Sequence, residues 1–337
     1  MRFEVTPAQP AGAELRRIGA ALVEHAIAQV DDPGVPSDAA VHETRKAMKK
    51  LRGLLRLVRN AAPDLYKAEN RAFRDAAAQL AVVRDADVAV ETFDRVLARA
   101  GNSPAKSARH QADTGASRLH ADAEPLELAS LRAALYAYRS EAHAGAGDAD
   151  SRLAQFRARM LEARERLAGW ELPDTGRERD AFAPFGPGLQ KTYRRGRKAM
   201  ARAYRMPSVE AFHEWRKRTK YLRYHLRLLR LAWPEQLKTQ GAAVKKLQTL
   251  LGEDHDLAVL EELLATFHTG DTVPAETGAE RALRAEMLRQ RDLLRRRARL
   301  LGELVYAERP KAFRRRIAAY WRQAERAAEA DPESAGG

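Results

Sequence analysis

Cysteine is absent from the 337 residues of the sequence, and its absence excludes several kinds of chemistry. Disulfide bonds, thiolate metal sites and cysteine nucleophiles all require the missing side chain. Long apolar runs are absent too, since no stretch approaches the about 18 uncharged residues of a membrane-spanning helix. The opening residues, MRFEVTPAQPAGAELRR, lack the apolar core of a signal peptide. We therefore expect a soluble cytoplasmic protein without membrane insertion.

Runs of alternating β-branched residues are also missing. Apolar residues recur instead at steps of three and four through nearly every segment, which is the period of an amphipathic helix. The sequence therefore predicts an all-α fold of antiparallel helices. The breaks between them are expected where proline, glycine and aspartate gather, at 31–38, Pro63, 101–104, near 145, Pro207, Pro234 and 270–274.

Charge is abundant and unbalanced, with 60 Lys and Arg against 46 Asp and Glu and a net charge of +14. Such an excess indicates an anionic partner. Composition alone leaves nucleic acid, polyphosphate and an acidic membrane surface open. It is also compatible with cations that merely solvate the outer faces of helices.

The length of the chain exceeds the usual size of one hydrophobic core, so two domains or a duplicated pair of bundles are expected. The clearest boundary is LPDTGRERDAFAPFGPG, which has several Pro and Gly and no helical period. We predict an N-terminal helical bundle at 1–171, a linker at 172–188 and a C-terminal helical bundle at 189–337.

An internal repeat is the most informative feature of the sequence. The segment VHETRKAMKKLRGLLRL at 41–57 matches FHEWRKRTKYLRYHLRL at 212–228, an offset of 171 residues. A second match joins RDADVAV at 84–90 to EDHDLAV at 253–259, an offset of 169 residues. Two similar offsets indicate two copies of one helical unit.

Each copy places cations at steps of three and four residues, which form one lengthwise line on a helix. The first ridge contains His42, Arg45, Lys49, Arg52 and Arg56. The second ridge contains His213, Arg216, Lys220, Arg223 and Arg227, and Arg230 continues it by one step. At about 1.5 Å per residue, the first ridge is roughly 21 Å long. This length suits a polymeric anion better than a small molecule.

An apolar line runs beside each ridge and predicts the face that enters the core. It contains Val41, Met48, Leu51, Leu55 and Val58 in one copy and Phe212, Trp215, Leu222, Leu226 and Leu229 in the other. Like charges at these spacings repel by about 0.2–0.5 kcal/mol each, so a ridge held by the core is slightly destabilising without a ligand. A polyanion would relieve the repulsion, because Arg and Lys make charge-assisted bonds to phosphate oxygens.

A solvated helix face is the ordinary explanation for such a ridge. Its acidic partners would be Asp85, Asp87, Asp254 and Asp256. Against this explanation, the same order of cations occurs twice, and carboxylates four residues from the cations are scarce. Further cations at helical spacing are Lys67, Arg71, Arg74, Arg194, Arg197, Lys198 and Arg205. For the last four, an ordinary surface helix explains the pattern equally well.

The repeated units resemble the CHAD family, named for a histidine-containing α-helical domain. The family motif has His, then Arg three residues later, then Lys or Arg and Leu-Arg. Both basic segments match this motif, and each is followed by an acidic segment with Asp-x-Asp. Residues 193–197, Tyr-Arg-Arg-Gly-Arg, match the opening of the second half. The resemblance covers nearly the whole chain.

The resemblance implies two antiparallel helical bundles related by a pseudo-twofold axis, with basic helices lining a groove or pore that binds inorganic polyphosphate. The binding residues that it implies are His42, Arg45, Lys46, Lys49, Arg52, Arg56, His213, Arg216, Lys217, Lys220, Arg223 and Arg227. We add Arg71, Arg74, Arg194, Arg197 and Lys198 for their spacing. The first helix offers only Arg16 and Arg17, and the second acidic segment reads EDHD rather than RDAD, so we expect the anion closer to the second bundle.

Enzymatic chemistry has little support in the sequence. The position four residues after each motif histidine is Lys46 or Lys217 rather than a second histidine, so no zinc pair forms. The two Asp-x-Asp pairs could hold Mg²⁺ for phosphoanhydride hydrolysis, but residues two apart on a helix point in different directions. We predict a non-enzymatic protein with no catalytic residues, no metal site and no cofactor.

Nucleic acid is the main rival ligand, because cationic helices bind the phosphates of any polymer. Base recognition would need aromatic or amide groups among the cations, and Trp215, Tyr221 and Tyr224 are expected in the core or at its rim. Association with polyphosphate granules, or a scaffold role there, would use the same surface. The oligomeric state, the preferred polymer length and the cellular process are left open, as is whether both ridges contact one ligand.

Overall fold

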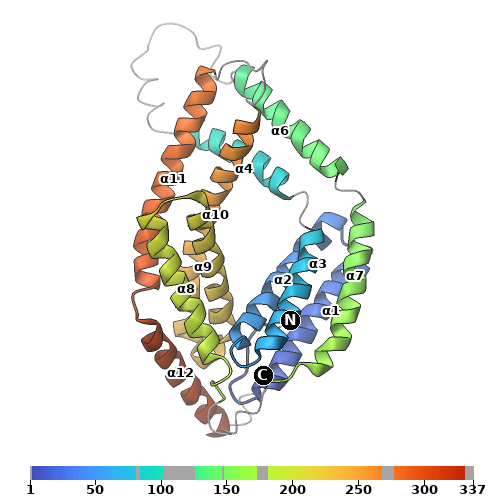
Figure 1. Cartoon of the computed structure of the whole chain (residues 1–337), viewed down its shortest axis with the longest axis vertical. Coiled ribbons are helices and arrows are strands. Elements are labelled where there is room, and N and C mark those ends of the chain that lie inside the picture. The colour runs from blue at the N-terminus through green and yellow to red at the C-terminus, as the bar shows by residue number, and fades with distance from the viewer. Residues whose placement is uncertain are drawn as a thin grey trace. The chain divides into compact units, whose positions relative to one another are not determined.

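The computed structural model describes residues 2–80, 84–101, 126–145, 148–172, 181–267 and 277–330. Every regular element in these ranges is a helix, so the predicted all-α class is confirmed (Figure 1). None of the helices in the same ranges is long and apolar enough to cross a membrane. The longer helices are α1 (Ala11–Asp31), α2 (Ser37–Val58), α3 (Pro63–Gln79), α4 (Arg84–Gly101), α6 (Leu126–Gly145), α7 (Ala149–Arg166), α8 (Gly186–Arg205), α9 (Val209–Leu228), α10 (Pro234–Thr266), α11 (Gly278–Val305) and α12 (Pro310–Ala330), with short 3₁₀ turns at Leu167–Gly169 and Arg230–Ala232.

Prolines and polar caps explain where several helices begin. Pro63, Pro234 and Pro310 are each the first residue of a helix, where the missing N–H costs nothing. Ser208 caps α9 by accepting a hydrogen bond from the Ala211 N–H. The breaks predicted at Pro63, Pro207 and Pro234 are thus confirmed. Helix α8 already begins at Gly186, so the last residues of the predicted linker are helical, while 270–274 lie outside the described residues.

The chain divides into two compact units. Unit 1 consists of Met1–Ala81, Asp148–Thr249 and Arg299–Gly337, and unit 2 consists of Val82–Gly147 and Leu250–Ala298. Unit 1 therefore holds residues from both sides of the predicted linker. The proposed border between two homologous halves remains a prediction.

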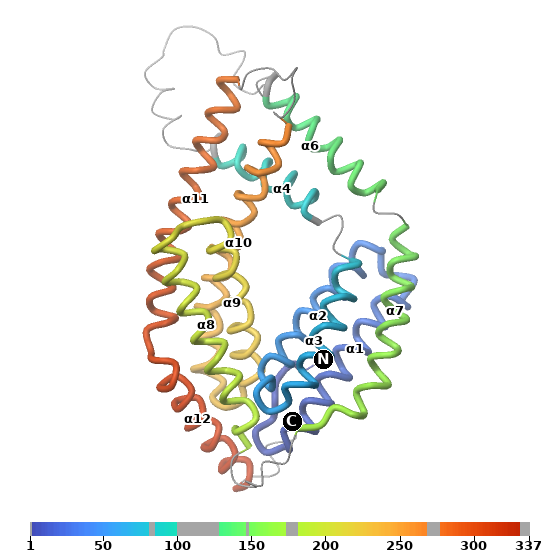
Figure 2. The backbone as a smooth tube through the Cα atoms, viewed as in Figure 1, coloured from blue at the N-terminus to red at the C-terminus, as the bar shows by residue number. Residues whose placement is uncertain are grey.

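In unit 1 the helices form two groups that meet through α2 (Figure 2). Helices α1, α2, α3 and α7 pack together in one group, and α8 packs on α9 and α12 in the other. Helix α2 contacts both α8 and α9. The predicted apolar lines form the cores of these contacts, since Met48, Leu51, Phe212 and Trp215 are all buried. This packing fixes the direction of both ridges.

The crossing of α2 and α9 depends on close backbone approach. A Cβ added at Gly53 would lie 3.0 Å from the Cβ of Tyr224, the residue 171 positions later. Next to it, the Nε2 atom of the buried His225 lies 3.1 Å from the Gly53 carbonyl oxygen, and burial lowers the pKa of His225 to about 3. Equivalent positions of the repeat therefore pack against each other, as two helices related by a twofold axis would. The twofold relation itself stays a prediction.

Unit 2 has its own apolar core, built around Phe93, Leu135, Leu260 and Met287. The acidic residues singled out in the sequence pair within this unit. The buried Asp254 accepts hydrogen bonds from Arg295 at 2.8 Å and Arg291 at 3.4 Å. Asp87 lies 2.9 Å from His143 Nε2. These arginine and histidine partners are not members of the basic ridges, so for Asp87 and Asp254 the structure does not show the pairing with ridge cations that the alternative of a solvated helix face required.

Candidate functional site

The two ridges approach each other around Lys220 of α9. The four charges that act most strongly on this lysine are those of Lys49, Arg52 and Arg56 on α2 and Arg216 on its own helix. All four are positive. We call these five residues, Lys49, Arg52, Arg56, Arg216 and Lys220, the basic cluster. All five were predicted as site residues from the sequence.

Burial and repulsion by neighbouring cations change the pKa of Lys220. Its side chain is partly buried against Tyr221, with Nζ 5.8 Å from the ring centroid. Burial, followed by the positive charges of Lys49 and Arg216, lowers the pKa of Lys220 to about 7. Like charges repel more strongly where burial reduces the screening by water. The free protein therefore carries a local electrostatic cost at the basic cluster.

Neutral groups hold several ridge arginines in place. Asn70 Oδ1 on α3 accepts hydrogen bonds from Arg56 at 2.7 Å and from Arg52 at 3.3 Å. On the second ridge, Gln248 Oε1 on α10 accepts one from Arg223 at 3.2 Å. An amide oxygen orients a guanidinium without cancelling its charge. The arginines are thus ordered while their charge remains available to an anion.

Arg56 is the most buried member of the basic cluster. Its guanidinium stacks on the ring of Tyr221, 4.0 Å from the centroid, and also donates to the Arg52 carbonyl oxygen at 2.9 Å. Burial lowers the pKa of Arg56. The stacking and the hydrogen bonds to neutral oxygens fix the position of this arginine at the buried side of the cluster.

The cationic region extends beyond the predicted residues toward the start of α8. Arg59 is buried, donates to Thr192 Oγ1 at 3.1 Å and to the Gly188 carbonyl oxygen at 3.3 Å, and burial lowers its pKa to about 10. The positive charges of Arg195 and Arg56 act on it in the same direction. Burial and the charge of Arg59 also lower the pKa of Lys191. The repeat could have revealed Arg59, because it is equivalent to Arg230 at the end of the second ridge.

Equivalent lysines of the two motifs each face a carboxylate. Lys46 donates to Glu43 at 2.9 Å, and Lys217 forms an ion pair with Glu214 at 3.1 Å. The hydrogen bond from Lys46 lowers the pKa of Glu43. Arg218, which sequence reasoning omitted, also pairs with Glu214. Lys46 and Lys217 are therefore each paired with a glutamate of their own helix.

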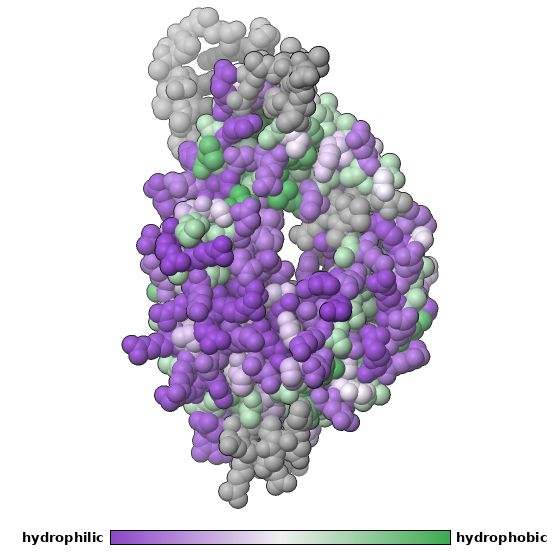
Figure 3. Space-filling model, in the orientation of Figure 1, coloured by the Kyte–Doolittle hydropathy of each residue, from purple (hydrophilic) through white to green (hydrophobic). Residues whose placement is uncertain are grey.

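Other predicted residues differ in their partners and in their exposure. Arg74 pairs with Asp75 at 2.9 Å, and the charge of Arg71 also acts on Asp75. Arg197 donates to the Glu308 carbonyl oxygen, and Arg45 donates to that of Leu80. The remaining positions are His42, Arg194, Lys198 and Arg227, which are exposed, and His213, which is partly buried. Hydrophilic residues cover much of the face over α8 and α9 (Figure 3).

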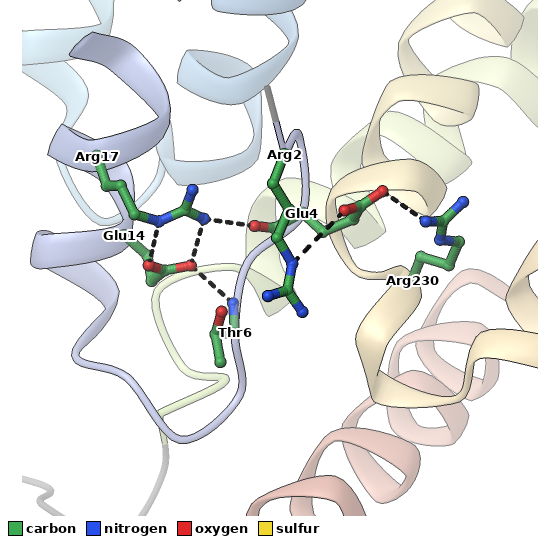
Figure 4. A network of polar contacts seen from close by, with 6 residues as sticks. All are labelled: Arg2, Glu4, Thr6, Glu14, Arg17 and Arg230. Atoms are coloured by element: carbon green, nitrogen blue, oxygen red, sulfur yellow. Dashed lines mark hydrogen bonds and ion pairs between the residues drawn. The ribbon is translucent and has the colours of Figure 1, made fainter. Parts of the chain in front are cut away.

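The N-terminal segment lies against Arg230, at the C-terminal end of the second ridge (Figure 4). Its backbone is anchored by a hydrogen bond from the Val5 N–H to the Leu228 carbonyl oxygen at 2.8 Å. The nearly buried Glu4 then pairs with Arg230 at 2.8 Å. Phe3 is fully buried, and Lys50 and Arg227 both lie over its ring. The second ridge therefore ends at a carboxylate, whereas the first continues into the buried Arg59.

The described part of the chain is thus an all-helical protein in which two cationic helices meet around neutral hydrogen-bond partners. Residues 17–265 match the family model of the CHAD domain. Because this match covers more than half of the sequence, the chain belongs to the CHAD domain family, which is associated with polyphosphate binding. No curated protein matches the chain. Among solved structures it is similar to the crystal structure of the CHAD domain from the plant Ricinus communis, with a TM-score of 0.48 and 20% identity over 87% of this chain and 91% of that chain.

Proposed function

We propose that the chain is a non-enzymatic module that binds inorganic polyphosphate at the basic cluster. The observation that carries this proposal is the meeting of Lys49, Arg52 and Arg56 with Arg216 and Lys220 from a second helix. A polyanion would offset their mutual repulsion by adding negative charge beside them. The same binding would hold the protein at polyphosphate granules.

A polymer fits the cations better than a single phosphate ion does. The positive charges continue from Arg56 of the cluster to Arg59, which follows α2, and from there to Lys191 on α8. A linear chain of phosphates can contact such a row in succession, and each contact adds to the affinity. Orthophosphate would use only two or three of the cations.

Hydrolysis and base recognition have less support. Within the described ranges, no group of three or more acidic or histidine side chains is placed to hold a metal ion. Tyr221 is buried beneath Arg56, and Trp215 is fully buried, so neither offers an open face for stacking a base. Phosphate contacts alone would then carry any binding of nucleic acid.

The direct test is a competition measurement with a labelled long polyphosphate at near-physiological salt. Unlabelled polyphosphate should displace it at far lower phosphate concentration than single-stranded DNA, double-stranded DNA or orthophosphate. Equal competition by DNA would favour a general polyanion site. Equal competition by orthophosphate would argue against a polymer site.

Charge-removing variants locate the site. Replacing Arg45, Lys49, Arg216 and Lys220 by Ala should abolish binding and leave the helical content unchanged. A matched control removes the same charge from exposed lysines of unit 1, namely Lys238, Lys245, Lys246 and Lys311. Both variants weaken long-range attraction, but only the first removes direct contacts. Similar affinities for the two variants would contradict the assignment.

A further inference from the structure

Lys220 has the surroundings of a nucleophilic amine rather than of a simple counter-charge. Its side chain is partly buried, and its Nζ lies 5.8 Å from the centroid of the Tyr221 ring. The guanidinium of Arg56, from helix α2, lies 4.0 Å from the centroid of the same ring, so cations of two helices meet beside this amine. Desolvation and neighbouring cations both favour the neutral form of an amine, and only the neutral form attacks an electrophile.

The size of the effect separates Lys220 from an ordinary lysine. A lysine with the usual pKa near 10.4 is neutral in about one molecule in a thousand at pH 7.4. The pKa of Lys220 is lowered to about 7, first by burial and then by Lys49, Arg216, Arg52 and Arg56. At the same pH the neutral amine is therefore a major species.

We propose that Lys220 is a site of covalent acylation by small acyl phosphates, whose phosphate group the surrounding cations attract to the amine. The proposal does not require a bound polymer, because a single phosphoryl group contacts only two or three cations. Arg52, Arg56 and Arg216 would orient that group, and their guanidiniums cannot themselves lose a proton and react. The basic cluster thus combines arginines that bind an anion with one nucleophilic lysine.

The reaction balances without any further reagent. The lone pair of Lys220 Nζ attacks the acyl carbonyl carbon and forms a C–N bond. The bond between that carbon and the bridging oxygen breaks, and phosphate leaves with the electron pair. The proton released from the nitrogen goes to the departing phosphate. The products are an N-acyl lysine and inorganic phosphate.

Acylation would change the basic cluster in a defined way. It removes the ability of Lys220 to become charged when an anion binds, so one phosphate contact is lost. For a single-stranded polymer this lowers the slope of log affinity against log salt by about 0.7. The modified protein should therefore bind polyanions more weakly, and most clearly at low salt.

The test incubates the full chain with acetyl phosphate at pH 7.5 and follows acetylation of individual lysines by peptide mass spectrometry. Lys245 and Lys246, both exposed on α10, serve as internal references. Lys220 should react at least tenfold faster than either. Its rate should level off above about pH 8, while the rates at the references continue to rise. A rate at Lys220 equal to or below the references overturns the proposal.

Two variants separate the electrostatic cause from general accessibility. Lys49→Gln removes the charge that acts most strongly on Lys220 and should slow its acetylation severalfold at pH 7.5. Lys46→Gln removes a charge from the same helix that is paired with Glu43, and should leave the rate unchanged. Equal effects of the two variants would contradict the mechanism.

Repeating the acetylation in the presence of polyphosphate distinguishes this proposal from the proposed function. Long polyphosphate added beforehand should protect Lys220 and leave Lys245 unprotected if both proposals hold. Fast acetylation of Lys220 without protection or polymer binding would refute the proposed function alone. Tight polymer binding with an unreactive Lys220 would refute the acylation alone.

Discussion

Individual cations in this protein differ in what holds them, and their partners decide which are available to a ligand. Arg52 and Arg56 share a neutral amide oxygen, whereas Lys46 and Lys217 each face a glutamate. A cation bound to an amide keeps its full charge, while one bound to a carboxylate has already been neutralised. The arginines are therefore the stronger candidates for anion contacts, although all four belong to the repeated motif.

The substitution Asn70→Asp tests this distinction. It places a carboxylate between Arg52 and Arg56, where charge-assisted bonds contribute about 1.5–3 kcal/mol each. We expect a higher melting temperature and at least a tenfold loss of polyphosphate affinity. Asn70→Leu removes the same amide without adding charge, and should lower the melting temperature. A gain in both stability and affinity for Asn70→Asp would contradict the role of the neutral partner.

The pH dependence of binding should report on Lys220. The pKa of this lysine is about 7 in the free protein, and a bound polyanion raises it. Below about pH 6 the amine is charged in both states, so Lys220 should add no pH dependence to the affinity. Above pH 7 binding takes up a proton, and affinity should fall by up to tenfold per pH unit.

Calorimetry in buffers of different ionisation enthalpy would measure that proton uptake. Lys220→Arg keeps a permanent charge and should bind without the pH dependence. The folding stability of the free protein should depend on pH in the opposite direction to the affinity. Folding lowers the pKa of Lys220, so above pH 7 this lysine binds fewer protons in the folded protein than in the unfolded chain. Stability should then rise with pH in that range. Identical proton uptake by the Lys220→Arg variant would exclude Lys220 as the source.

At the scale of helices, the position of α2 against α8 depends on one glycine. A Cβ added at Gly188 would lie 1.8 Å from the carbonyl oxygen of Leu57, which is backbone and cannot swing aside. Gly188→Ala should therefore destabilise the protein by about 2–3 kcal/mol. Gly241→Ala on α10 meets nothing within 4 Å and should stabilise it by up to about 1 kcal/mol. Denaturant unfolding of both variants checks the opposite signs, and a neutral Gly188→Ala would refute the close approach.

The N-terminal segment limits the second ridge. Glu4→Gln would release Arg230 from its ion pair and offer one more cation to a bound polymer. We expect polyphosphate affinity at low salt to increase about three- to tenfold. Glu235→Gln makes the same change in net charge at an exposed position of α10 and should have little effect. Equal effects of the two substitutions would mean that Glu4 acts only through the overall charge.

Periodicity in the sequence predicted the helical elements well, because each apolar line is local. Met48, Leu51 and Trp215 are buried where the three- and four-residue steps place them. The spacing also predicted that Lys49, Arg52 and Arg56 share one face. The pairing of Lys46 with Glu43 could also have been predicted, because oppositely charged residues three positions apart on a helix are neighbours.

Contacts between distant segments were beyond the reach of periodicity. The convergence of Lys49 with Lys220 depends on α2 crossing α9, and that crossing depends on the close approach at Gly53. The roles of Asn70 and Gln248 likewise arise from neighbouring helices. The partner of Asp254 on α11 was missed for the same reason. The family resemblance was correct in membership and in the all-helical class.

For the molecule as a whole, the central claim is that both ridges act on one ligand. If about five cations contact successive phosphates, the slope of log affinity against log salt should be near −3.5, by analogy with single-stranded nucleic acid. Raising salt from about 50 to about 200 mM would then weaken binding roughly a hundredfold. Two independent sites would each show a smaller slope.

The most direct measurement is the calorimetric stoichiometry of a short polyphosphate of defined length, compared between the natural chain and two ridge variants. One variant changes Lys49, Arg52 and Arg56 to Gln, and the other changes Arg216, Lys220 and Arg223 to Gln. We predict one polymer per chain, with both variants weakening that single site and lowering its salt slope. Two polymers per chain, with each variant losing one and leaving the other unchanged, would contradict the account.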